Sequence, residues 1–196
     1  MPTDRIRRAI EQITAKPDPA RLAQIADLAS RASDAAETRR APLEPIMDEL
    51  EALTGFREGP RYWASFHGGG GPEEFAAVIA LPLPEPIIDL DPAETGTLLA
   101  LEESVRLGDQ AVYQRVLKYL SACLGEAFNT DLIYWPHREM NAAELLDEVI
   151  RRRGILRVEG IAGLRAYELG LAEDVMASGD APLLAQQWAE LILARN

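Results

Sequence analysis

Cysteine and histidine are scarce in this sequence of 196 residues. Because Cys123 is the single cysteine, no disulfide can form within the chain and no cysteine-based zinc site can be built. The two histidines, His67 and His137, are far apart, and neither has a partner at the Glu-x-x-His spacing of a di-metal helical bundle. We therefore expect no metal site and no cofactor.

Long apolar runs and basic patches are also missing. The longest apolar stretches are far shorter than the roughly 20 residues of a membrane span, and the N-terminus lacks the apolar run of a signal peptide. We expect a cytoplasmic protein without membrane contact. The net charge of −12 is spread along the chain, which disfavours binding to nucleic acid. This acidity would attract basic partners, or it simply keeps the protein soluble.

Motifs for catalysis are absent. His67 and the four glycines after it resemble the oxyanion loop of lipases and esterases, but the Gly-x-Ser-x-Gly nucleophile elbow is missing. No Gly-Lys-Ser/Thr follows the glycines, as a phosphate-binding loop requires. The adjacent acid pairs Glu73/Glu74 and Glu102/Glu103 would point their members to different sides of a helix, which is typical of solvated faces. We predict that the protein is not an enzyme.

No strand-like alternation is long enough for a sheet, and apolar residues at helical spacing predict an all-α protein. The N-terminal part should contain helices capped by Thr3 and Asp18, a third over 42–53 that stops at Gly55, and an aromatic cluster before a helix at 72. The aromatic cluster comprises Tyr62, Trp63 and Phe66.

Alternating prolines at 82, 84 and 86 forbid helix and mark a stiff connector. They predict an N-terminal helical segment (1–81), a proline-rich connector (82–90), a helical module (91–154) and C-terminal helices (155–196). In the module, Asp91 with Glu94 and Asn141 with Glu144 have the form of capping boxes.

Gly108, Gly125 and Gly154 should end the helices 91–107, 109–124 and 141–153. The arginines at 151–153 would then lie in a last helical turn, where the helix dipole favours cations. Residues 155–158 have β-propensity, and helices should follow at 161–176 and 182–194.

One short stretch differs from its surroundings: Asp131-Leu132-Ile133-Tyr134-Trp135-Pro136. Thr130 can cap a first turn, Asp131 suits the positive end of the dipole, and Pro136 limits the helix to one or two turns. Tyr134 and Trp135 are adjacent, so one helical face cannot bury both. Either the two rings anchor a partner, or they fill the gap between longer helices.

With its flanking helices, this motif resembles the immunity proteins of the DNase colicins and pyocins. That family has a short third helix of pattern Asp-x-Ile-Tyr-Tyr-Pro, preceded by two longer helices and followed by one more. The resemblance covers residues 91–154 and implies a four-helix module. It also implies that Asp131, Tyr134 and Trp135 belong to a toxin-binding surface and that the second helix supplies specificity.

The sequence departs from the family in three respects. Trp135 stands where the family has a second tyrosine, and the second helix carries Arg115 and Lys118 where the family's is acidic. The connection from 136 to 141 is also somewhat short. We expect a bacterial immunity-type protein that neutralises a cognate, basic, nuclease-type toxin, with Tyr113 contributing to the surface. The alternative is a helical scaffold or adaptor with an unknown protein partner; the oligomeric state is left open.

Overall fold

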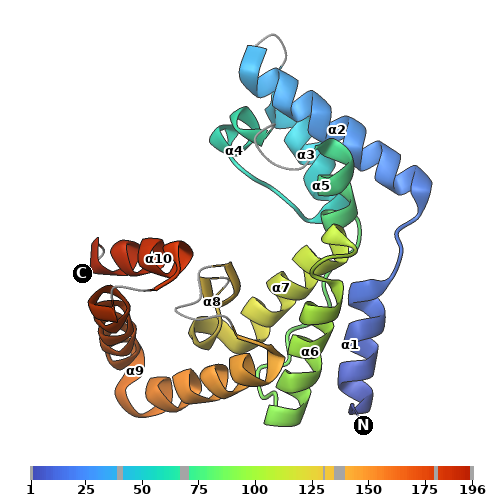
Figure 1. The fold of residues 1–196 in the computed structure, drawn as a ribbon. Helices are drawn as coiled ribbons and strands as arrows, with labels where there is room; N and C mark the ends of the chain where they lie inside the picture. Colours follow the sequence, from blue (N-terminus) through green and yellow to red (C-terminus); the bar gives the residue numbers. More distant parts are fainter. Residues whose placement is uncertain are drawn as a thin grey trace. The chain divides into compact units, whose positions relative to one another are not determined.

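The computed structural model describes residues 2–38, 42–66, 71–129, 131–134, 140–178 and 181–194. All regular structure in these ranges is helical, and they contain no strand, so the all-α prediction is confirmed (Figure 1). Within the same ranges no helix is both long and apolar enough to cross a membrane.

The chain divides into two compact units. Unit 1 comprises 1–6, 85–106 and 116–196, and unit 2 comprises 7–84 and 107–115. One boundary falls between Pro84 and Glu85, inside the proline-rich stretch. The other boundaries fall within or next to helices, where no composition shift marks them.

Unit 2 is built mainly from the first five helices. Their bounds are α1 (Asp4–Thr14, whose first residues belong to unit 1), α2 (Pro19–Thr38), α3 (Glu44–Thr54), α4 (Pro60–Ala64) and α5 (Pro72–Ile79). Helix α2 packs against α3, α4 and α5, and its inner face contributes Ile25, Leu28, Ala29 and Ala32 to one continuous core.

The predicted caps of unit 2 are present. The Asp18 carboxylate accepts hydrogen bonds from the backbone N–H groups of Ala20 and Arg21, at 2.8 and 3.1 Å. Gly55 ends α3 with φ 74°, a left-handed conformation that glycine adopts without steric cost.

An aromatic cluster closes the core of unit 2, as predicted. Trp63 is fully buried, and its ring meets those of Tyr62 and Phe66 at centroid distances of 5.2 and 5.3 Å. Phe56 and Phe75 join the cluster from the segments before α4 and in α5. The contacts of Trp63 with Phe56, Tyr62 and Phe75 are edge-to-face, a geometry that adds to the stabilisation from burial alone.

Unit 1 contains the remaining helices. Their bounds are α6 (Pro92–Val105), α7 (Gln110–Leu124, whose first residues belong to unit 2), the 3₁₀ turn η2 (Gly125–Ala127), α8 (Asp131–Tyr134), α9 (Ala142–Ser178) and α10 (Leu183–Ala194). Helix α9 packs against α6, η2 and α10.

The capping boxes of α6 and α9 are confirmed. Asp91 accepts from the N–H of Glu94 at 2.8 Å, and the Glu94 side chain accepts from the N–H of Asp91. Asn141 and Glu144 make the same reciprocal pair, at 3.0 Å each way.

Two expectations for α9 are wrong. The helix does not stop at Gly154 but continues through the β-prone residues 155–158, and it turns sharply at Gly160, where φ is 67° and ψ is −163° (Figure 1). Local β-propensity is a weak preference that packing overrides. Only glycine readily adopts the backbone conformation of Gly160, so the glycine at 160 breaks the helix and the one at 154 does not.

Candidate functional site

The short helix of the sequence motif is present. Helix α8 is one turn long, and its Leu132 N–H is held by the backbone and side-chain oxygens of Asn129, each at 3.2 Å. Leu132 is buried and Ile133 is half-buried, which fixes the turn to unit 1. Asn129 is a capping residue that the sequence analysis did not predict. Asparagine is a common N-cap residue, so its place directly before Thr130 and Asp131 could have indicated the cap.

The proposed contact residues of the motif are only partly described. For Asp131 and Tyr134 the structure describes the backbone, as the two ends of α8, and not the side chains. Thr130 and Trp135 lie outside the described residues. A partner surface on these side chains therefore stays a prediction.

The preceding helix offers less surface than the resemblance implies. Tyr113 is 3% exposed and Arg115 is 1% exposed, so both side chains lie inside the protein. One guanidinium nitrogen of Arg115 donates to the carbonyl of Gln12 at 2.8 Å, and burial lowers the pKa of Arg115. Tyr113 therefore offers a partner almost no ring surface in this structure, whereas Lys118 is exposed on the same helix.

The arginine run has structural partners. Because α9 turns at Gly160, its residues 148–152 meet residues 167–168 of its second half. Arg152 is 2% exposed and is bonded to Glu168, an ion pair that no local pattern in the sequence indicates. The prediction that the run lies in a last helical turn is wrong, since α9 runs through it.

Arg151 and Tyr167 complete this network. The Tyr167 hydroxyl donates to a carboxylate oxygen of the buried Glu148 at 3.0 Å and accepts from Arg151 at 3.2 Å. Burial raises the pKa of Tyr167. The hydrogen bond that Arg151 donates to Tyr167 raises the pKa of Arg151. Arg151 and Tyr167 both keep their protons at neutral pH, so these hydrogen bonds connect the two halves of α9 across its turn.

The prediction that Glu102 lies on a solvated helix face is wrong. This residue is 1% exposed, and its two carboxylate oxygens accept from Arg106 at 2.9 and 2.8 Å. The sequence reading placed the Glu102/Glu103 pair on a solvated face; only Glu103 is exposed. The arginine four residues later supplies the bidentate partner that a buried carboxylate needs.

A hydrogen-bonded junction anchors the start of α6. Glu94 is 2% exposed, and it accepts from Thr3 at 2.6 Å and from two nitrogens of Arg5 at 2.5 and 2.8 Å. The bonds from Arg5, more than those from Thr3, lower the pKa of Glu94 to about 2. Asp89 holds a further nitrogen of the same guanidinium at 2.9 Å.

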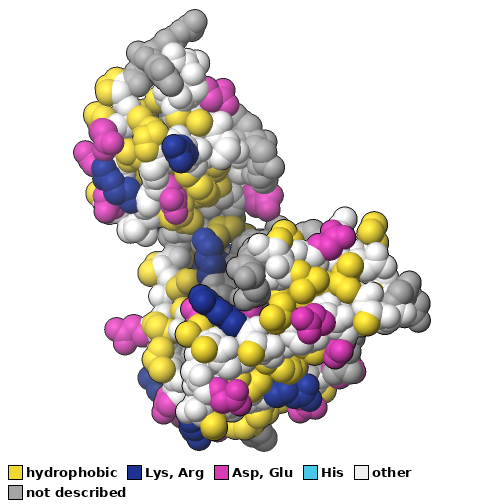
Figure 2. Space-filling model, turned by 90° about the vertical axis from the view of Figure 1, so that its left-hand side faces the viewer, with side chains coloured by type: hydrophobic (Ala, Val, Ile, Leu, Met, Phe, Trp, Pro, Cys, Tyr) yellow, Lys and Arg dark blue, Asp and Glu magenta, His cyan; other side chains and the backbone are white. Residues whose placement is uncertain are grey.

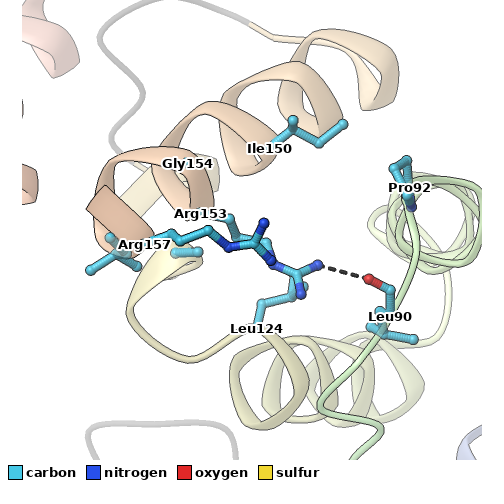
Figure 3. A pocket seen from close by; sticks show the side chains of 9 residues that line it. Leu90, Pro92, Leu124, Ile150, Arg153, Gly154 and Arg157 are labelled. Atoms are coloured by element: carbon cyan, nitrogen blue, oxygen red, sulfur yellow. Dashed lines mark hydrogen bonds between the residues drawn. The ribbon is translucent and has the colours of Figure 1, made fainter. Parts of the chain in front are cut away.

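A pocket of about 620 Å³ opens between the start of α6, the end of α7 with η2, and the middle of α9 (Figure 3). Nine described residues line it: Leu90, Pro92, Leu124, Ala127, Ile150, Arg153, Gly154, Leu156 and Arg157. Its walls are therefore mostly aliphatic, with two guanidinium groups as the charged part.

Among the described residues, the remaining candidate groups for chemistry do not come together. His67 and His137 lie outside the described residues. Among those that are described, no three His, Cys, Asp or Glu side chains are grouped so that they could hold a metal ion. Cys123 is 4% exposed, and burial raises its pKa, so its thiol is not disposed to act as a nucleophile.

Comparison with known proteins returned no match to a family model, a curated protein or a solved structure.

Proposed function

We propose that this protein is an immunity-type binding protein, which neutralises a cognate basic toxin through a surface on helix α8. The contact residues of the proposal are Asp131, Tyr134 and Trp135. It rests on the motif at 131–136, whose Asp-x-Ile-Tyr-aromatic-Pro pattern resembles the toxin-binding helix of colicin and pyocin immunity proteins.

The order of helices around the motif is the observation that carries the proposal. Two helices of 14 and 15 residues, α6 and α7, precede a single turn, and a long helix that opens on the Asn141 capping box follows it. Leu132 is buried, which holds α8 on unit 1. Tyr134 and Trp135 are adjacent in the sequence, so one helical face cannot bury both.

Charge supports the choice of a basic partner. Asp and Glu outnumber Lys and Arg by 32 to 20. Charge complementarity accelerates encounter with a cationic protein, and large aromatic side chains within a polar rim supply most of the binding energy at such interfaces. Arg115, one of the two basic residues that set the second helix apart from the family, is buried and so does not oppose a cationic partner at the surface.

Protection of cells tests the proposal. A basic nuclease-type toxin encoded beside this gene should kill bacteria when expressed alone and spare them when the wild-type protein is co-expressed. The Tyr134→Ala/Trp135→Ala variant should lose this protection although its far-UV circular dichroism stays native, and Leu107→Ala, at a 98% exposed apolar residue, should retain it. Equal protection by the double variant would refute the role of α8.

A helical scaffold or adaptor is the second candidate, and exposed apolar side chains on α10 favour it. Leu183, Leu184 and Leu191 are 68%, 53% and 47% exposed. Figure 2, which faces the side on which α9 and α10 lie in Figure 1, shows hydrophobic side chains interspersed with acidic ones. Several exposed apolar side chains on one helix are the observation that this candidate would explain as a protein contact.

Fluorescence of Trp135 separates the two candidates. The other two tryptophans, Trp63 and Trp188, are buried at 0% and 6% exposure and would be replaced by Phe, which keeps an aromatic ring at each core position. A toxin-binding Trp135 should emit at long wavelength and be quenched readily by acrylamide. Blue-shifted, protected emission would mean that the ring fills the core, as the scaffold candidate requires.

A further inference from the structure

The pocket beside α9 combines aliphatic walls with two arginines. Arg153 and Arg157 are one helical turn apart, and with Ile150 and Gly154 they form a single stripe along α9 that faces the cavity (Figure 3). The lining contains no carboxylate among its nine described residues, although acids outnumber bases in the chain as a whole. The local charge of the pocket is therefore opposite to that of the protein.

The two guanidinium groups differ in their partners. Arg153 donates one N–H to the carbonyl of Leu90 at 2.8 Å, which fixes this side chain against the start of α6 and leaves further N–H groups for other acceptors. Arg157 is exposed and makes no hydrogen bond or ion pair with any described residue. Like charges one turn apart on a helix repel, and an anion between them would relieve that repulsion.

Gly154 opens the floor of the pocket. A Cβ atom built at this position meets no atom of the described residues within 4 Å. A glycine inside a helix lowers helix stability by about 1 kcal/mol relative to alanine. The absence of a side chain at Gly154 also leaves space between the two arginines.

We propose that this pocket binds a small organic acid, with a carboxylate held by Arg153 and Arg157 and an aliphatic body against Pro92, Ile150 and Leu156, the lining apolar side chains that keep exposed surface. Guanidinium groups match a carboxylate in geometry and charge. The cavity volume lies within the range of about 300–1,000 Å³ that is typical of small-molecule sites. Because no aromatic residue is among the nine that line the pocket, we assign an alkyl chain and not a ring to the ligand body.

Calorimetry with decanoate and its neutral analogue decan-1-ol tests the site on the full chain. Wild type should bind decanoate at least tenfold more tightly than decanol. Arg157→Gln should remove this preference, whereas Arg165→Gln, which removes the same charge from an exposed position in the second half of α9, should not. Gly154→Leu should weaken binding of both compounds, because it places a branched side chain between the two arginines, and Arg157→Gln keeps the test decisive if this variant does not fold.

Three results would overturn the proposal. The first is equal affinity for the acid and the alcohol, which means an apolar crevice without anion recognition. The second is wild-type affinity in both Arg157→Gln and the Gly154 variant, which means that decanoate binds elsewhere. The third is binding of inorganic phosphate as tight as that of decanoate, which would show an anion site that makes no use of the aliphatic walls.

Discussion

At the scale of single residues, buried ionic groups with specific partners distinguish this protein from an ordinary helical chain. Glu94, Glu102 and Arg152 are each at most 2% exposed, and each is paired with an oppositely charged side chain. Removing one member of such a pair leaves an uncompensated buried charge, which is more costly than the pair itself is stabilising.

Glu94 makes the stability of the folded protein depend on pH in the acid range. Its pKa is lowered from 4.5 to about 2, so the folded state favours the ionised carboxylate. The resulting stabilisation is complete above pH 4.5 and is lost as the pH falls from there towards 2. In Glu94→Gln, the melting temperature should be lower at pH 7 and should change less between pH 5 and 2 than in wild type, as measured by thermal circular dichroism. Parallel acid profiles for the two proteins would contradict this role.

Two arginines should differ sharply in their contributions. Arg152→Ala leaves Glu168 without its buried partner and should reduce the free energy of unfolding by about 3–5 kcal/mol in urea titrations. Arg31→Ala, at a side chain that is 51% exposed and paired with the 67% exposed Asp27, should cost about 1 kcal/mol or less. Similar losses for the two variants would argue against the ion pair across the turn of α9.

At the scale of elements, caps and stops decide the helix boundaries, and the sequence predicts most of them. Asp18, Asp91 and Asn141 begin helices as their side chains suggest, and Gly55 ends one. These signals are local, because a cap acts on backbone groups two or three residues away. The turn of α9 at Gly160 was not predictable in the same way, because the sequence alone indicates a helix break at Gly154 as strongly as at Gly160.

The two glycines of α9 should respond oppositely to the same substitution. Gly154 has ordinary helical geometry and free space, so Gly154→Ala should stabilise the protein by up to about 1 kcal/mol. Gly160 has φ 67° and ψ −163°, so Gly160→Ala should destabilise it by about 1–3 kcal/mol. Urea unfolding of both variants measures this, and stabilisation by Gly160→Ala would mean that α9 can continue straight.

At the scale of the whole molecule, the fold class was predictable and the arrangement of units was not. Helical periodicity and the absence of strand alternation indicate an all-α protein. Assignment of 1–6 to unit 1 and of 107–115 to unit 2 depends on contacts between residues far apart in the sequence. The same reason explains why the sequence reading missed the pairing of Arg152 with Glu168 and the pocket between α6, α7 and α9.

The candidate site was predicted only as far as local pattern extends. The motif at 131–136 and the order of its flanking helices can be read from the sequence, and the one-turn helix α8 is present. Burial of Tyr113 and Arg115 could not be read there, because helical spacing alone does not show which faces of α7 are covered.

The most direct test of the account is a titration of a candidate toxin, a basic nuclease-type protein, with this protein while DNA cleavage is followed. Wild type should inhibit at a one-to-one ratio, with weaker binding at high salt because charge complementarity is screened. The Tyr134→Ala/Trp135→Ala variant should bind at least a hundredfold more weakly, as expected when two aromatic anchors are lost. Full inhibition by a natively folded double variant would contradict the central claim that α8 is the toxin-binding element.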